Sequence, residues 1–194
     1  MTPSVAKYVF LVALLVFSVI RLPRDWKSRK VDIARSHYGW VEWLRIGAST
    51  WGLAIIPIIA ATTTLARGAD LPFRTWLAWI GAAIFAVALW MFWSAHRELG
   101  RNFSQSLVVR QSHTLVTGGI YSYMRHPMYT AFWLWVIAQA LLLQNWLVAL
   151  CGIAGWGYLF FGRIGQEEAM MRETFGEQYD AFARRTKRLV PWIY

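Results

Sequence analysis

Two polar segments of this sequence carry residues that could take part in chemistry. The first is HTLVTGGIYSYMRHPMY, residues 113–129. Pro127 suits the first position of a helix, which leaves His126 just before the helix starts. Free backbone N–H groups and the positive end of the helix dipole gather there, so the position attracts a carboxylate or another anion.

Three tyrosines in the same segment offer ring faces that can hold a cation or stack on adenine. They are Tyr121, Tyr123 and Tyr129. The alternative is an interfacial loop, with its tyrosines among lipid headgroups and Arg125 on a lipid phosphate.

The second segment, RIGQEEAMMRETFGEQYDAFARRTKRLVPWIY, covers residues 163–194. Arg163 and Glu167 are four residues apart and therefore share one helical face. An Arg at the end of an apolar run is costly unless it has a partner or a task, so this is either an ion pair that ends the helix or part of a site. Four further charged residues are interpreted as a solvated face: Glu168, Arg172, Glu173 and Glu177. Aromatic residues of the tail are expected to pack it back on the protein: Phe175, Tyr179, Phe182 and Trp192.

The composition indicates which class of protein positions these segments. Of 194 residues 57% are hydrophobic and only 15% are charged, whereas soluble domains carry about 25% charge. Thirteen Trp add to this, because Trp favours the lipid–water boundary. The sequence therefore predicts a single all-α integral membrane domain over residues 1–194. The net charge of +10 lies between apolar runs, so membrane orientation and anionic headgroups explain it better than nucleic acid, which we do not expect as a partner.

Five apolar runs are predicted to span the membrane. They cover residues 5–20, 43–65, 73–95, 128–143 and 146–161. Arg21, Pro23 and Arg24 follow the first run in place of a small-residue cleavage site, so we interpret it as a retained helix and not a signal peptide. Pro57 predicts a kink in the second run. Residues 1–95 thus hold three N-terminal spans, and residues 96–194 form the expected catalytic core.

The last two predicted spans are short, and only Gln144-Asn145 separates them, so they are expected to form a tight helical hairpin. Four glycines of the fifth span should let the backbones of that hairpin approach closely. They are Gly152, Gly155, Gly157 and Gly162.

The positions of Lys and Arg predict the orientation of the chain. The segments 21–45, 96–126 and 163–188 are rich in these residues, whereas the loop between the second and third spans has only Arg67 and Arg74. Positive residues favour the cytoplasmic side, which predicts a multi-pass cell membrane protein with its N-terminus outside. Its C-terminus, including a helical cofactor-binding region, and its active site are then expected on the cytoplasmic side.

At the two polar segments the sequence resembles the isoprenylcysteine carboxyl methyltransferase family. HTLVTGGIYSYMRHPMYTAFW is similar to the family's G-x-Y…R-H-P-x-Y cofactor segment, and RIGQEEAMMRETFGEQYDAF is similar to its second signature. The resemblance covers roughly residues 96–194 and includes the final Arg188–Pro191 pattern R-x-x-P. It implies a methyltransferase within the membrane that uses S-adenosylmethionine and releases S-adenosylhomocysteine. The implied methyl acceptor is the C-terminal carboxylate of a prenylated cysteine, on a small molecule or a protein, which enters from the bilayer.

The resemblance also implies roles for particular residues. Arg163 would contact the carboxylate of the acceptor as the catalytic and substrate-binding residue, and Glu167 would hold a polar group of the cofactor. Ala131 stands where family relatives often have Gly, which affects packing more than chemistry. The remaining residues of the implied cofactor pocket are His113, Thr114, Leu115, Val116, Tyr121, His126, Pro127, Met128 and Tyr129.

Three alternatives remain open from the sequence. A similar core occurs in enzymes that methylate the amine of phosphatidylethanolamine, where His126 or Glu167 would act as a base. A similar C-terminal pattern occurs in intramembrane reductases. A non-catalytic membrane protein would bind no cofactor. The single cysteine and the lack of an H-E-x-x-H motif give no reason to expect a metal site.

Overall fold

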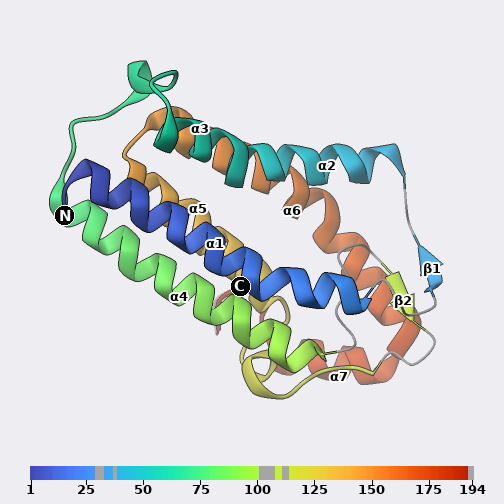
Figure 1. The fold of residues 1–194 in the computed structure, drawn as a ribbon. Helices are drawn as coiled ribbons and strands as arrows, with labels where there is room; N and C mark the ends of the chain where they lie inside the picture. The colour runs from blue at the N-terminus through green and yellow to red at the C-terminus, as the bar shows by residue number, and fades with distance from the viewer. Residues whose placement is uncertain (29–32, 37–38, 101–107, 111–113, 192–194) are drawn as a thin grey trace.

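The structure of this chain, a computed structural model, describes residues 1–28, 33–36, 39–100, 108–110 and 114–191. The described residues are almost entirely helical, and long helices lie side by side in a bundle (Figure 1). The α-helices are α1 Pro3–Ser28, α2 Trp40–Thr50, α3 Ile56–Thr62, α4 Thr75–Leu99, α5 Pro127–Leu143, α6 Trp146–Phe175 and α7 Glu177–Arg185. The shorter helical turns are η1 Trp51–Ile55, η2 Arg67–Ala69 and η4 Gly119–Ser122. The predicted helical architecture is confirmed, apart from one short antiparallel pair of strands, β1 Ile33–Ser36 and β2 Val108–Arg110.

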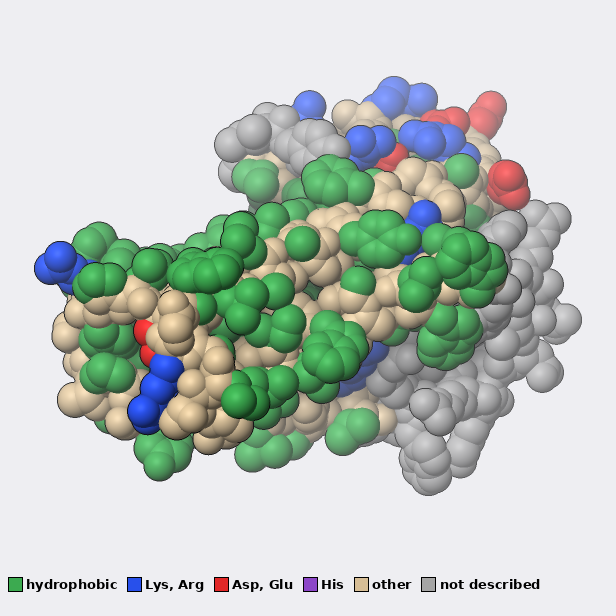
Figure 2. Space-filling view, turned by 90° about the horizontal axis from the view of Figure 1, so that it is seen from above, with side chains coloured by type: hydrophobic (Ala, Val, Ile, Leu, Met, Phe, Trp, Pro, Cys, Tyr) green, Lys and Arg blue, Asp and Glu red, His purple; other side chains and the backbone are tan. Residues whose placement is uncertain are grey.

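Four helical segments are long and apolar enough to cross a membrane. They are Pro3–Leu22, Trp40–Thr62, Thr75–Leu99 and Trp146–Phe175, and the apolar helix α5 is shorter, with 17 residues. Large apolar side chains such as Leu15, Trp79 and Phe161 are exposed on the outside of the bundle, and the face seen in Figure 2 is largely hydrophobic. An exposed apolar surface of this kind suits lipid as the surrounding solvent, and the chain is a multi-pass membrane protein.

Helix α6, which contains the fifth predicted span, is longer than the sequence predicted. The fifth apolar run was expected to end near residue 161, but α6 has 30 residues and continues through the polar signature to Phe175. No proline interrupts this stretch, and the helix ends at Gly176, whose φ of 51° lies in the left-handed region. The expectation of two short helices is therefore wrong for α6. As a consequence, Arg163 and Glu167 project from the same continuous helix that crosses the bundle.

The irregularity predicted at Pro57 takes the form of a π-helical turn. Pro57 lacks an N–H group, and its ring is incompatible with regular helical bonding to the turn before it. The helix widens at η1, just before α3, where the backbone hydrogen bonds join residues five apart instead of four. The side chain of Gln139 from α5 donates from Nε2 to the Gly52 carbonyl in this turn at 3.0 Å. A buried amide thus satisfies backbone polarity that the π-helical turn exposes.

The helices form two groups that enclose the site. One group contains α1, α4 and α5, which pack against one another, and the other contains α2, η1 and α6. Two of the four glycines singled out in α6, Gly155 and Gly162, face α2, which corrects the expectation that these glycines serve the α5–α6 pair. A Cβ atom at Gly155 would overlap the Ala48 carbonyl, and one at Gly162 would overlap the Arg45 side chain. Gly152 faces the Gln139 side chain of α5, while Gly157 has only ordinary contact distances.

Gly52 provides a test of this close approach. Gly52 lies in η1, which continues directly from α2, and a Cβ atom there would overlap the carbonyl of Cys151 on α6, so Gly52→Ala should push this helix and α6 apart. Overpacking of this kind costs on the order of 1–3 kcal/mol, and the melting temperature of detergent-solubilised protein should fall. Gly47→Ala is the matched control on the same helix, because no atom lies within 4 Å of its Cβ position. Equal melting temperatures for the two variants would show that the α2–α6 contact is loose.

Candidate active site

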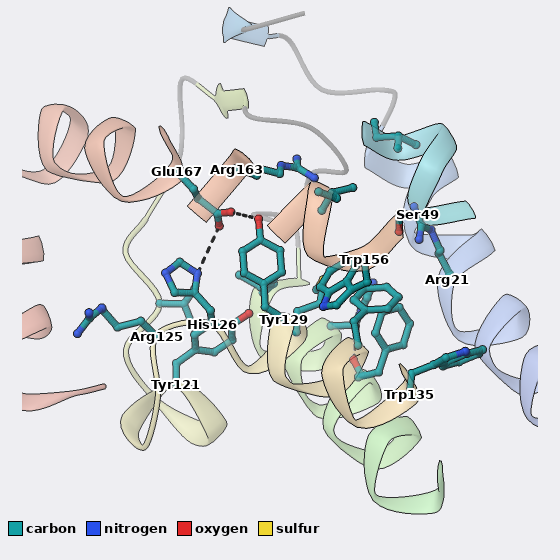
Figure 3. A pocket seen from close by; sticks show the side chains of 18 of the residues that line it. Arg21, Ser49, Tyr121, Arg125, His126, Tyr129, Trp135, Trp156, Arg163 and Glu167 are labelled. Atoms are coloured by element: carbon teal, nitrogen blue, oxygen red, sulfur yellow. Dashed lines mark hydrogen bonds and ion pairs between the residues drawn. The ribbon is translucent and has the colours of Figure 1, made fainter. Parts of the chain in front are cut away.

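A cavity of about 480 Å³ lies between the two helix groups. Its walls come from the C-terminal halves of α1 and α4, from α2 and the η1 turn, from the segment before α5 and the N-terminal half of α5, from the later turns of α6, and from α7. Figure 3 shows Arg125, His126 and Glu167 at one side of the cavity and Trp135 and Trp156 at the other. The cavity is therefore polar at one end and aromatic at the other, with a volume that suits a small molecule.

The structure brings most of the sequence-predicted site residues to this cavity. Pro127 is the exception among those described, because it is buried in the first turn of α5 and does not line the cavity. His113 lies outside the described residues. The predicted residues that line the cavity are Thr114, Leu115, Val116, Tyr121, His126, Met128, Tyr129, Arg163 and Glu167.

The start of α5 is held in place by the C-terminal tail. The backbone N–H of Arg125 donates to the Lys187 carbonyl at 2.7 Å, and that of His126 donates to the Arg188 carbonyl at 2.9 Å. One turn into α5, the Thr130 hydroxyl donates to the Leu189 carbonyl at 2.8 Å. These bonds tie the tail that carries the final R-x-x-P pattern to the R-H-P motif, although about 60 residues separate the two in the sequence.

His126, Tyr129 and Glu167 form one cluster at the polar end. The Tyr129 hydroxyl donates a hydrogen bond to Oε2 of Glu167, and Nδ1 of His126 lies 3.8 Å from Oε1 of the same carboxylate. The rings of His126 and Tyr129 are stacked, with centroids 5.4 Å apart and planes 14° apart. The Glu167 side chain keeps 26% of its surface exposed, so its carboxylate can still meet a ligand in the cavity (Figure 3).

Glu168 is a functional neighbour that the sequence interpretation missed. It was assigned to a solvated face, but it is 1% exposed. Its carboxylate accepts from Nε of Arg125 at 3.2 Å and from Nη2 of Arg188 at 2.8 Å, and it lies 3.4 Å from Nε2 of His126. Ile164, one turn earlier on α6, is also buried, so this face of the helix points inward. The other members of the predicted face, Arg172, Glu173 and Glu177, are exposed as expected.

Arg163 has a partner that the sequence did not indicate. Arg163 is 9% exposed, and its Nε lies 3.3 Å from Oε1 of Glu42 on α2. Glu42 is itself only 4% exposed. The signal for it was an acidic residue at the start of an otherwise apolar span, which is costly in a membrane unless a cation lies nearby.

Tyr121 contributes a neutral ring to the polar end. It is buried in η4, where Gly119 adopts a φ of 58° and leaves room for the Glu98 side chain. Burial, reinforced by the carboxylates of Glu167 and Glu98, raises the pKa of the Tyr121 phenol well above its ordinary value. Burial likewise raises the pKa of Tyr179 to about 12. Both phenols therefore stay protonated at physiological pH and do not act as bases.

The tail packs as the sequence predicted wherever it is described. Tyr179 and Phe182 of α7 are buried, and Phe175 packs against the same cluster beside Tyr121. Trp192 lies outside the described residues. Tyr179 and Phe182 of α7 also line the cavity and so contribute one of its walls.

Comparisons with known proteins support a single family. Residues 79–173 match the model of the isoprenylcysteine carboxyl methyltransferase (ICMT) family. Protein-S-isoprenylcysteine O-methyltransferase of Schizosaccharomyces pombe is 34% identical over 103 residues, which cover 52% of this chain and 43% of that protein. The enzyme named Protein-S-isoprenylcysteine O-methyltransferase B of Arabidopsis thaliana is 35% identical over 97 residues, which cover 48% of this chain and 49% of that protein. Protein-S-isoprenylcysteine O-methyltransferase of Homo sapiens is 30% identical over 125 residues, which cover 61% of this chain and 43% of that protein. The matched part is thus half or less of each of these relatives.

A solved structure shows the same fold. The eukaryotic intramembrane Ras methyltransferase ICMT superimposes with a TM-score of 0.61 and 20% identity, covering 100% of this chain and 69% of that one. The family match includes the R-H-P-x-Y motif at the start of α5 and the Arg163–Glu168 part of α6. Over residues 79–173 this chain is therefore similar to the isoprenylcysteine carboxyl methyltransferase family, as its two polar signatures predicted.

Proposed function

We propose that this protein transfers a methyl group from S-adenosylmethionine to the carboxylate of a lipidated acceptor, with a prenylcysteine α-carboxylate as the acceptor. The observation that carries this proposal is one cavity with a polar end, an aromatic end and a buried arginine in its wall. The family match and the relatives named protein-S-isoprenylcysteine O-methyltransferase support the same activity. The cofactor, the site residues and the acceptor are all parts of this proposal.

The polar end fits the chemistry of S-adenosylmethionine. The cofactor carries cationic ammonium and sulfonium groups, which the partly exposed Glu167 carboxylate and the neutral Tyr121 and Tyr129 rings would attract. Its carboxylate would lie near Arg125 and His126 at the N-terminus of α5, where backbone N–H groups and the helix dipole favour an anion. When bound, it would supply an activated methyl group on sulfur. Thr114, Leu115, Val116 and Met128 would line the remaining contact surface.

Arg163 would orient the acceptor. A carboxylate is already ionised at neutral pH and is its own nucleophile, so no general base is needed. In the proposed reaction the acceptor oxygen would take the methyl group, and the electron pair of the carbon–sulfur bond would remain with the sulfur of S-adenosylhomocysteine. Orientation of the oxygen and removal of water are the contributions open to the protein. A planar guanidinium can hold a carboxylate through two parallel hydrogen bonds and so fix one pose.

The aromatic end suits the lipid part of the acceptor. Leu14 and Phe17 of α1 and Trp43 and Ile46 of α2 are apolar residues of the cavity lining, and we assign them to one arm of the cavity. The Phe17 and Trp135 rings meet with centroids 4.9 Å apart and form an apolar wall. Because α1 packs mainly on α4 and α5 while α2 packs on α6, the arm runs between the two helix groups. We propose that the lipid tail enters sideways from the bilayer along this route.

The geometry of α6 supports a site at the membrane boundary. Thirty helical residues extend for about 45 Å, whereas the hydrocarbon core is about 30 Å thick. If α6 begins at one boundary, its later turns, with Glu167 and Glu168, emerge on the other side. We propose five spans, with α5 and the first part of α6 as a hairpin, the N-terminus outside and the C-terminal cofactor region in the cytoplasm. The basic residues of 163–188 favour that orientation.

Transfer of a radiolabelled methyl group tests the acceptor. Purified protein with labelled S-adenosylmethionine should label N-acetyl-S-farnesylcysteine, and mild alkali should release the label because the product is a methyl ester. The same compound with its carboxylate converted to an amide is the matched control and should stay unlabelled. Phosphatidylethanolamine, offered in parallel, should also stay unlabelled. Alkali-stable label on phosphatidylethanolamine alone would refute the carboxylate proposal and support the amine alternative.

A further inference from the structure

Helix α2 contributes a charged cluster to the wall of the cavity. Oε1 of Glu42 lies 3.3 Å from Nε of Arg163, and its Oε2 lies 3.8 Å from Nη1 of Arg45. The Arg45 side chain passes over Gly162 on α6, and its guanidinium carbon lies 6.0 Å from the centre of the Tyr158 ring. Glu42 therefore stands between two arginines, one from its own helix and one from α6.

Burial makes this arrangement more than a surface ion pair. Glu42 is 4% exposed and Arg163 is 9% exposed, so each charge would be costly without the other. Arg163 lines the cavity, whereas Glu42 lies behind it. Because the Glu42 carboxylate lies beside Nε of Arg163, it fixes the guanidinium plane from one edge. The Arg163 side chain extends away from Glu167 (Figure 3).

We infer that Glu42 is a positioning residue for the methyl acceptor, which it serves by fixing the guanidinium of Arg163. This inference rests on the proposed function, in which Arg163 binds the acceptor carboxylate. The two arginines and one glutamate sum to a single positive charge, which one acceptor carboxylate would neutralise. A protonated amine at the same place would add to the positive charge instead. Glu42 also lies outside residues 79–173, so it extends the site beyond the segment that matches the family.

Variants of Glu42 separate this role from simple support of the fold. Glu42→Ala should lower kcat/KM for N-acetyl-S-farnesylcysteine by about 10²-fold, since a misplaced orienting group costs that much. Glu42→Gln keeps the size of the side chain and an oxygen near Nε of Arg163 but removes the negative charge of the ion pair, so it should retain more activity than Glu42→Ala, with a loss of about threefold to tenfold. The dissociation constant of S-adenosylmethionine, measured by calorimetry, should stay within about twofold in both variants, because Glu42 does not line the cavity. Glu177→Gln, which removes an exposed carboxylate on α7, is the matched control and should behave as wild type.

The outcomes distinguish the inference from the function on which it rests. A wild-type protein that transfers no methyl group to the prenylcysteine would overturn both. An active wild type with unchanged kcat/KM in Glu42→Ala would overturn the inference alone. Cofactor affinity that falls in step with kcat/KM would also overturn it, because Glu42 would then only hold the fold. If Glu42→Ala does not fold, the isosteric variant Glu42→Gln provides the test. A loss of less than about twofold in its kcat/KM would then contradict the positioning role.

Discussion

Replacing Arg163 with alanine should lower kcat/KM for methyl transfer by about 10²-fold or more, while the affinity for S-adenosylmethionine stays within about twofold. The guanidinium sits in the cavity wall beside Glu42, apart from the His126–Tyr129–Glu167 cluster. It is therefore placed to hold the acceptor and not the cofactor. Kinetics with N-acetyl-S-farnesylcysteine and calorimetry with S-adenosylmethionine measure the two effects separately.

Arg163→Lys sharpens this prediction. Lysine keeps the positive charge that pairs with Glu42 but loses the planar fork, so activity should be intermediate and not restored. Arg172→Ala on the same helix is the control, because Arg172 is exposed and does not line the cavity. Loss of cofactor binding in Arg163→Ala would reassign the arginine to the cofactor, and full activity would remove it from the mechanism.

Glu167→Ala and His126→Ala should each weaken binding of S-adenosylmethionine by about tenfold to 100-fold. Glu167 offers a carboxylate that is oriented by the Tyr129 hydroxyl, and the cofactor carries cationic groups that would lose this partner. His126 stands between Glu167 and Glu168, so its removal also disturbs the carboxylate and the start of α5. Titration by calorimetry gives the dissociation constants directly.

Two controls make the cofactor prediction specific. Glu167→Gln keeps an oxygen for the Tyr129 hydroxyl but removes the charge, so it isolates the electrostatic part of binding. Glu173→Ala removes an exposed carboxylate of α6 and should leave the affinity unchanged. Wild-type affinity in both Glu167→Ala and His126→Ala would refute the assignment of this end of the cavity to the cofactor.

Much of the site follows from local sequence rules. Pro127 begins α5 and places His126 at its N-terminus, as the preference of proline for the first helical turn predicts. Arg163 and Glu167 lie on one helix because no residue between them breaks it. Apolar runs of sufficient length located the membrane helices, since lipid demands them. The family resemblance then grouped distant residues that the cavity brings together.

Contacts between helices could not be predicted in the same way. In water, the apolar face of a helix indicates which side is buried, but in lipid the outer face is apolar as well. Nothing in the pattern therefore showed that Gly155 and Gly162 face α2 instead of α5. The partnership of Glu42 with Arg163 depends on that packing and was missed for the same reason. Glu168 was misassigned because an exposed and a buried glutamate look alike in sequence, and only the tail residue Arg188 reveals the difference.

Titration of S-adenosylmethionine into the detergent-solubilised wild-type protein tests the central claim most directly. The account predicts saturable binding at one site per chain, competition by S-adenosylhomocysteine, and a melting temperature that rises with cofactor concentration through ligand linkage. NADPH, the reductant expected of an intramembrane reductase, should give no heat. Binding of NADPH with no response to saturating S-adenosylmethionine would contradict the account.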